Sequence, residues 1–182
     1  MVFPGTGAFW CAGGAARAAV SRRVRSATAA RSSGPPSTWN WTGIAASHSP
    51  AYIAGLLVFD ENGTAQGWCQ YGSPEELPGI KHRRAYEMDA PPSPDWRITC
   101  FFVDKKHRGQ GIARAALEGA LDQIAQLGGG LVEAISEVTA GRQAPGRFLF
   151  SATAELFEEN GFARVRQVGK HAWIMGKTIQ PA

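Results

Sequence analysis

The chain has 182 residues, of which 44% are hydrophobic and 19% are charged, and its formal net charge is +4. This length and hydrophobic content suffice for one domain with a sizeable core. No apolar run approaches the ~20 residues that a membrane-spanning helix needs, so the sequence predicts a soluble domain without a membrane partner.

The positive charge is confined to the start of the chain. Residues 1–59 contain five arginines and no acidic residue, which leaves a net charge of −1 for the rest. A basic segment without acidic residues can contact nucleic acid. Because the remaining sequence shows no comparable cationic face, we do not expect a nucleic-acid partner.

Residues 1–42 differ from the rest in being rich in Ala, Gly, Ser and Arg, and we expect a boundary between this segment and a domain at 43–182. Three interpretations of the segment stay open: an organellar transit peptide, a disordered tail, or a divergent start of the domain. We expect the protein in the cytoplasm, or in an organelle matrix if residues 1–42 are a transit peptide.

The three cysteines, Cys11, Cys69 and Cys100, are scattered and form no C-x-x-C pair. This pattern predicts neither a disulfide framework nor a metal site, and it favours a reducing compartment. Cys100 falls in an apolar run and is interpreted as a small buried hydrophobic residue.

Secondary structure is clearest from residue 51 onward. Apolar-rich runs at 52–59 and 64–71 flank Asn62-Gly63, a strong hairpin signal, and predict two antiparallel strands. Residues 72–94 contain many prolines and are predicted to be a loop. Further strands are expected at 97–103 and 131–135, and a last hairpin is expected from the runs at 162–168 and 171–178.

Between two of these strands lies a predicted helix at 112–127, which follows a charged turn with two glycines. One face of this helix is apolar, formed by Ile112, Ala116, Leu117, Ala120, Leu121 and Ile124. The first N–H groups of a helix lack partners and attract anions. The turn is therefore either a tight loop with solvated charges or an anion site. Neither the P-loop pattern nor the dinucleotide fingerprint fits it.

The turn reads Arg108-Gly109-Gln110-Gly111-Ile112-Ala113 and resembles the R/Q-x-x-G-x-G/A signature of the GCN5-related N-acetyltransferases (GNAT). A second landmark of that family, a helix ending in Gly-Phe, matches Gly161-Phe162. The segment GWCQYGSPEELP resembles a subgroup of acetyltransferase-like proteins of unassigned substrate. The likeness covers residues 51–179 and implies an α/β fold, the GNAT (acyl-CoA N-acyltransferase) fold. This is a mixed, mostly antiparallel sheet, parallel at a splay, with helices on both faces.

The resemblance also implies the activity, which is transfer of an acetyl group from acetyl-CoA to an amine by direct attack in a ternary complex. The acceptor is a small molecule or a protein, and no metal is expected. Phe102 and Val103 would contact the pantetheine arm, and the pyrophosphate would lie on Arg108, Gly109, Gln110, Gly111, Ile112 and Ala113. The charged cluster at residues 81–84 is either a solvated loop or a group above the cleft that recognises an acidic substrate group or the 3′-phosphate of coenzyme A.

The residues at the expected catalytic positions depart from the usual pattern of the family. The family's usual tyrosine acid corresponds to Phe157, which has no proton to donate. Ser151 is a candidate hydroxyl for the leaving sulfur, or simply the cap of the next helix. Glu133 is the first candidate for the general base, and it is equally compatible with a solvent-facing position. The alternative function is a catalytically degenerate acyl-CoA-binding module with a sensing or interaction role.

Overall fold

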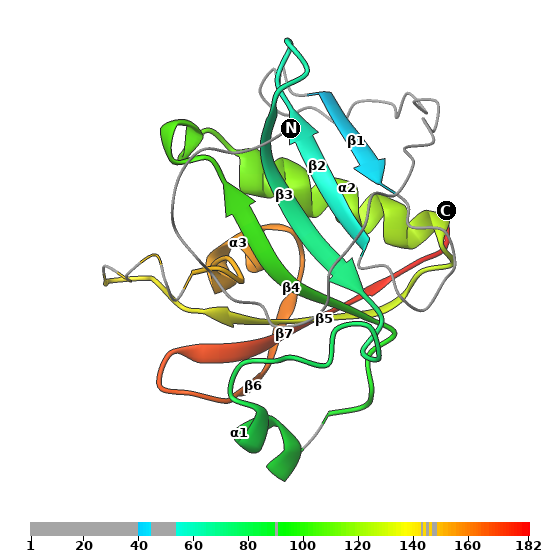
Figure 1. Ribbon diagram of the computed structural model, residues 1–182. Helices are drawn as coiled ribbons and strands as arrows, with labels where there is room; N and C mark the ends of the chain where they lie inside the picture. The colour runs from blue at the N-terminus through cyan, green and yellow to red at the C-terminus, as the bar shows by residue number, and fades with distance from the viewer. Residues whose placement is uncertain (1–39, 45–53, 90, 143, 145, 147–148) are drawn as a thin grey trace.

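The computed structural model describes residues 40–44, 54–89, 91–142, 144, 146 and 149–182. Seven strands within them form one sheet in the order β1-β2-β3-β4-β5-β7-β6 (Figure 1). The strands are β1 Asn40–Ile44, β2 Ala54–Phe59, β3 Ala65–Gly72, β4 Trp96–Val103, β5 Gly130–Glu137, β6 Ala163–Gln167 and β7 Ala172–Ile179. The α-helices are α1 Arg83–Met88, α2 Ile112–Gln126 and α3 Ala154–Glu159, and a 3₁₀ turn spans Lys105–His107.

The sheet is antiparallel at every junction except one. β4 and β5 pair in parallel, whereas the other neighbouring strands run in opposite directions. This confirms the expected mixed, mostly antiparallel sheet. β1 begins at Asn40, so the sheet includes residues that the sequence assigned to the N-terminal segment. Residues 1–39 lie outside the described part of the chain, and so do the three interpretations of that segment.

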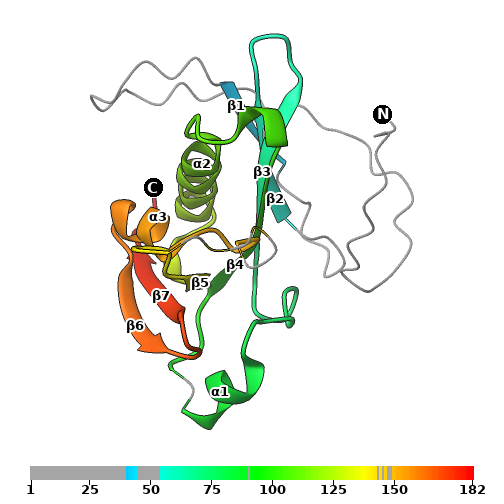
Figure 2. The same cartoon turned by 90° about the vertical axis from the view of Figure 1, so that its left-hand side faces the viewer.

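The main core lies between the sheet and helices α2 and α3, which share one side of it (Figure 2). All six apolar residues predicted for the face of α2 are buried. From α3, Phe157 is fully buried in the same core. The apolar period of a long helix therefore predicted both its position and the face that it buries.

A smaller core covers the opposite face of β5 and β7. Successive residues of a strand point to opposite faces, and Val132 and Ala134 belong to the main core while Ile135 belongs to the smaller one. Tyr86 of α1 packs in this second core. The two cores place helices on both faces of the sheet, as expected.

Helix α1 was not predicted, because residues 72–94 were expected to be a loop. With six residues and one buried side chain, α1 has no apolar stripe to reveal it. Its position depends instead on distant contacts: Arg166 of β6 donates hydrogen bonds to the carbonyls of Ala85 and Tyr86 at 3.1 and 3.0 Å.

Among the described residues, no helix has the length and apolar character required to cross a bilayer.

The parallel junction between β4 and β5 is held at one end by a compact set of bonds. The Asp95 backbone N–H donates to the Leu131 carbonyl at 2.9 Å, and the Leu131 N–H donates to the Asp95 carboxylate at 2.7 Å. The Trp96 indole donates to the Gly129 carbonyl at 2.8 Å. A Cβ on Gly130 would lie 2.6 Å from the Asp95 carboxylate, so the chain can approach this closely only with glycine there.

Candidate active site

The parallel strands β4 and β5 separate after three residue pairs. The register joins Trp96 to Val132, Arg97 to Glu133 and Ile98 to Ala134, and no pair follows. β4 nevertheless continues to Val103 and β5 to Glu137. The strand edges beyond Ile98 and Ala134 therefore face each other without pairing, which is the splay that the family resemblance implies.

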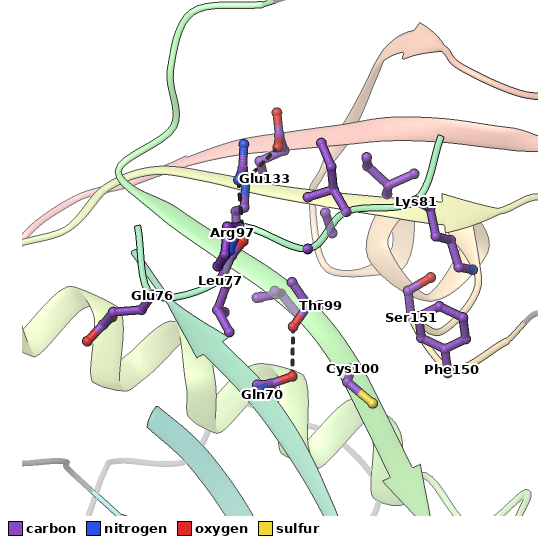
Figure 3. Close-up of a pocket in the computed structure, with 16 residues that line it drawn as sticks. Gln70, Glu76, Leu77, Lys81, Arg97, Thr99, Cys100, Glu133, Phe150 and Ser151 are labelled. Atoms are coloured by element: carbon purple, nitrogen blue, oxygen red, sulfur yellow. Dashed lines mark hydrogen bonds and ion pairs between the residues drawn. The ribbon is translucent and has the colours of Figure 1, made fainter. Parts of the chain in front are cut away.

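A cavity of about 410 Å³ lies at this splay (Figure 3). Its walls come from both separated strands, from the segment that precedes α1, and from the chain just before α3. The lining residues are 97–100 of β4, 133–135 of β5, 76–81, Gln70, Phe150 and Ser151. Cys100 was expected to be buried, but it is partly exposed and lines this cavity.

The backbone of β4 offers amides to the splay at alternate residues. The Phe101 N–H points away from β3 and donates to the Phe150 carbonyl at 2.6 Å, whereas the Asp104 N–H donates to Gln66 of β3 at 2.8 Å. Because amide directions alternate along a strand, the Val103 N–H faces the splay with that of Phe101. The Phe102 amide faces β3, and its side chain is half exposed.

The glycine turn joins β4 to α2. Gly109 and Gly111 have φ angles of 78° and 81°, in the left-handed region that glycine enters without a steric penalty. No side chain caps α2, and its first intrahelical bond is from the Ala115 N–H to the Gly111 carbonyl at 3.0 Å. The earlier N–H groups of the helix therefore remain directed out of its N-terminus.

Cationic side chains surround this uncapped terminus. Lys105, Lys106 and Arg108 are exposed, and the Arg108 guanidinium donates to the Val103 carbonyl at 3.4 Å, which ties the turn to the end of β4. Arg114 pairs with Glu159. Backbone N–H groups with nearby cations form a donor set that suits a phosphate-bearing ligand. Among the described residues, no cluster of His, Cys, Asp and Glu suits a metal ion.

Glu133 is buried at the closed end of the splay, with 4% of its surface exposed, so it does not face solvent. Its carboxylate accepts a hydrogen bond from the Tyr86 hydroxyl at 2.9 Å and pairs with the Arg97 guanidinium at 3.3 Å. Burial raises the pKa of Glu133, and the bonds from Tyr86 and Arg97 oppose that rise. A carboxyl group with a raised pKa suits proton transfer, although both of its oxygens already have partners.

Ser151 is the buried hydroxyl of the cavity. Only 3% of the residue is exposed, and its hydroxyl has no hydrogen-bond partner among the described residues. The expectation that it caps α3 is wrong: Thr153 is the N-cap, and its hydroxyl accepts from the Leu156 N–H at 3.2 Å. The intervening Ala152 has a φ of 59°, an unfavourable conformation for a residue with a Cβ. Ser151 lies two residues before the N-cap of α3.

Phe157 fills the position where the resemblance implies a tyrosine. Its ring is fully buried and makes edge-on contacts with Phe101 at 6.0 Å and Phe162 at 4.9 Å between ring centroids. This position therefore contributes packing and no proton.

The basic cluster at residues 81–84 divides into two parts. Lys81 lines the cavity, and its ammonium group lies 4.1 Å from the centroid of the Phe150 ring. His82, Arg83 and Arg84 are exposed. The cluster therefore divides between the cavity wall and the surface, and recognition of an acidic group by it stays a prediction.

Sequence reasoning missed three residues of the site: Tyr86, Arg97 and Phe150. One signal was present, because Arg97 and Glu133 are charged residues inside apolar strand runs, and buried charges occur in pairs. Tyr86 and Phe150 lie in segments without periodicity, so no pattern pointed to them.

One comparison with known proteins identifies a family. The profile described as "Acetyltransferase (GNAT) family" matches residues 23–162. No curated protein matches the sequence.

Similar solved structures include the ribosomal-protein-S18-alanine N-acetyltransferase from Escherichia coli, with 15% identity, TM-score 0.43, and 71% of each chain covered. The spermidine/spermine N-acetyltransferase from Vibrio cholerae has 15% identity and TM-score 0.42, with 69% of this chain and 66% of that one covered. The chain thus spans about two thirds of the length of such structures. On the strength of the family match over residues 23–162, the chain belongs to the GNAT family of acetyltransferases.

Proposed function

We propose that the chain transfers an acetyl group from acetyl-CoA to an amine, by direct attack of the amine in a ternary complex. One observation carries this proposal: β4 and β5 stop pairing after Ile98, and β4 continues from the resulting cavity to the uncapped start of α2. A long ligand with phosphates at one end and a reactive group at the other fits these two adjoining features.

The donor end would be held by the turn. Its phosphates would accept hydrogen bonds from the backbone N–H groups around Gly109, Gly111 and Ala113, with Arg108 adding a charge-assisted bond. Gln110 and Ile112 complete this turn, and the apolar side chain of Ile112 is buried beneath it. Phe102 and Val103 would contact the pantetheine arm, with the Phe102 ring half exposed beside it.

When bound, acetyl-CoA supplies an activated acyl group as a thioester. The chain's own residues must then handle the protons. An acceptor amine with a pKa near ~10.4 is mostly protonated at neutral pH, and Glu133 is the proposed base, acting directly or through water. The Val103 amide would donate to the carbonyl oxygen as it gains negative charge. The Ser151 hydroxyl, which has no other partner among the described residues, would donate to the leaving sulfur.

The acceptor is proposed to enter the cavity opposite the donor, as a small molecule or as part of a protein. The cavity wall from residues 76–81 carries the apolar side chains of Leu77 and Ile80 beside charged Glu76 and Lys81. We also propose a cytoplasmic location, because no disulfide joins Cys69 or Cys100 to another described residue and the sequence favours a reducing compartment.

A second function is favoured by Phe157. A fully buried phenylalanine at the implied acid position suits an acyl-CoA-binding module that no longer turns over efficiently. Release of coenzyme A in the presence of a panel of amines separates the two functions. Release that depends on an amine supports the transferase, and binding without release supports the module.

The experiment that tests the cofactor site is thermal unfolding with and without saturating acetyl-CoA. Ligand at about a hundred times its Kd adds roughly 2.7 kcal/mol to the free energy of unfolding, which is a shift of about 5–11 °C in Tm. The double variant Arg108→Ala/Gly111→Asp should lose this shift. The matched control Lys170→Ala/Gly63→Asp changes an exposed cation and a glycine with φ of 76° and should keep it. No shift in a cooperatively folded wild type would refute the proposal.

A further inference from the structure

Lys81 brings an amine to the splay itself. Its ammonium group lies 4.1 Å from the centroid of the Phe150 ring, and the Phe150 carbonyl accepts the hydrogen bond from the Phe101 N–H on the open edge of β4. Figure 3 shows Lys81, Phe150 and Ser151 grouped on one side of the cavity, with Cys100 of β4 below them. Phe150 thus links Lys81 to the edge of β4 along which the proposed acyl donor would run.

The backbone on both sides of Lys81 is anchored. Before it, the Leu77 carbonyl accepts a hydrogen bond from Arg97 at 3.4 Å. After it, the Ala85 carbonyl accepts from Arg166 at 3.1 Å, and both Ile80 and Ala85 pack against the smaller core. A side chain that projects from so short a fixed segment stays close to the cavity, which raises the effective concentration of its amine there.

The surroundings also favour the reactive form of this amine. Burial lowers the pKa of Lys81, while electrostatic interactions with Glu137 and Cys100 raise it by a smaller amount. A lower pKa leaves more of the side chain as neutral amine at a given pH, and only the neutral amine is a nucleophile.

We propose that Lys81 is an internal acetyl acceptor, modified by the acetyl-CoA bound to the same molecule. This inference rests on the proposed function, since it needs the acetyl donor at the splay. The Nζ lone pair forms a bond to the acetyl carbonyl carbon, and the carbon–sulfur bond breaks with its electron pair left on sulfur. The proton lost from nitrogen passes to the thiolate, directly or through water, so that the products are acetyl-lysine and coenzyme A.

The modification would change the cavity. Acetylation removes the positive charge of Lys81 and with it the cation–π contact with Phe150. The wall that faces an incoming acceptor becomes neutral and bulkier. Acetylated enzyme should therefore select acceptors differently from unmodified enzyme.

The test is incubation of the full chain with acetyl-CoA, followed by peptide mass spectrometry of acetyl occupancy. Lys170, exposed on the turn between β6 and β7, is the internal control for non-enzymatic acetylation. We expect Lys81 to be acetylated at least about tenfold faster than Lys170. In the Arg108→Ala/Gly111→Asp variant, occupancy at Lys81 should fall to the level of Lys170. The Lys81→Arg variant should carry no acetyl group at residue 81, and the acetyl occupancy of its other lysines should not change.

Two further readouts decide the outcome. A first-order rate that does not change when the protein is diluted supports transfer within one molecule, and a rate proportional to protein concentration overturns it. If the wild type shows the acetyl-CoA thermal shift while Lys81 and Lys170 react equally, the internal acceptor is refuted and the cofactor site stands. If the thermal shift is also missing, the proposed function itself fails.

Discussion

The backbone N–H of Phe101 donates a hydrogen bond of 2.6 Å to the carbonyl of Phe150, across the opening between β4 and β5. Phe150 thus holds one of the two amides that β4 directs toward the splay, and the other belongs to Val103. A ligand that runs along this edge has to compete with the Phe150 carbonyl.

Phe150→Ala should therefore raise the affinity for acetyl-CoA. The change removes the ring that lies against Lys81 and loosens the carbonyl, so a bond worth about 1 kcal/mol no longer opposes the ligand. We expect a gain of about two- to tenfold in affinity, measured by titration calorimetry. Phe150→Tyr keeps the ring and should bind like the wild type. Equal affinities for the wild type and both variants would show that the ligand and the Phe150 carbonyl do not compete for the Phe101 N–H.

Ser151→Ala should separate stability from turnover. The hydroxyl is buried without a partner among the described residues, so its removal should raise the free energy of unfolding by up to about 1 kcal/mol while lowering turnover. Ser136 is the matched control, because it is equally buried and its hydroxyl donates to the Ser151 carbonyl at 2.9 Å. Ser136→Ala should cost about 1–3 kcal/mol in chemical denaturation. A stability loss of the same size in Ser151→Ala would mean that its hydroxyl has a structural partner.

Glu133→Gln should lower turnover roughly 10²-fold and leave the affinity for acetyl-CoA nearly unchanged, if the carboxylate acts as the base. Tyr86→Phe removes one hydrogen bond to that carboxylate without removing the carboxylate, and should have a much smaller effect. Steady-state kinetics across pH measures both. Glu133 would be eliminated as the base by a variant whose turnover matches the wild type at every pH.

The acetylation rate of Lys81 should depend on pH differently from that of a model lysine peptide. Burial lowers the pKa of Lys81, so its neutral fraction reaches one half at a lower pH than that of a free lysine side chain. The rate at Lys81 should therefore rise with pH and level off first, while the rate of the model peptide in the same solution continues to climb. Site-resolved mass spectrometry over a pH series gives both curves, and coincident curves would contradict the expectation.

Phe157→Tyr tests the degenerate alternative. The ring is packed on edge against Phe101 and Phe162, and a hydroxyl added there would be buried without a partner, which should lower the free energy of unfolding by about 1–3 kcal/mol. We expect no gain in turnover. A large gain at intact stability would instead show that the missing acid limits turnover in the wild type, as expected for a degenerate module.

The sequence predicted the helices and strands that carry a long apolar pattern or a distinct turn signal, and it missed those that do not. Helix α2 has four turns of apolar period, and its predicted face is the buried one. The hairpin of β2 and β3 followed from Asn62-Gly63. By contrast, the six residues of α1 have no period, and the helix is positioned by Arg166 from a strand about eighty residues later.

The candidate site divides in the same way. The turn at 108–113 could be recognised because its glycines and the neighbouring cations lie within one short stretch of sequence. The state of Glu133 could not, since its burial depends on Arg97 and Tyr86 from two other elements. Ser151 and Thr153 are chemically alike as caps, and Ala152 between them has a positive φ that no local preference predicts.

The bonds between Asp95 and Leu131 have a consequence for the order in which the protein folds. These residues are 36 positions apart, and all of β4 and α2 lies between them, so joining them closes a long loop at a high entropic cost. The hairpins β2–β3 and β6–β7 close over much shorter distances along the chain. We expect the parallel pair, and with it the cavity, to assemble after those hairpins have formed, which makes the candidate active site one of the last parts of the chain to fold.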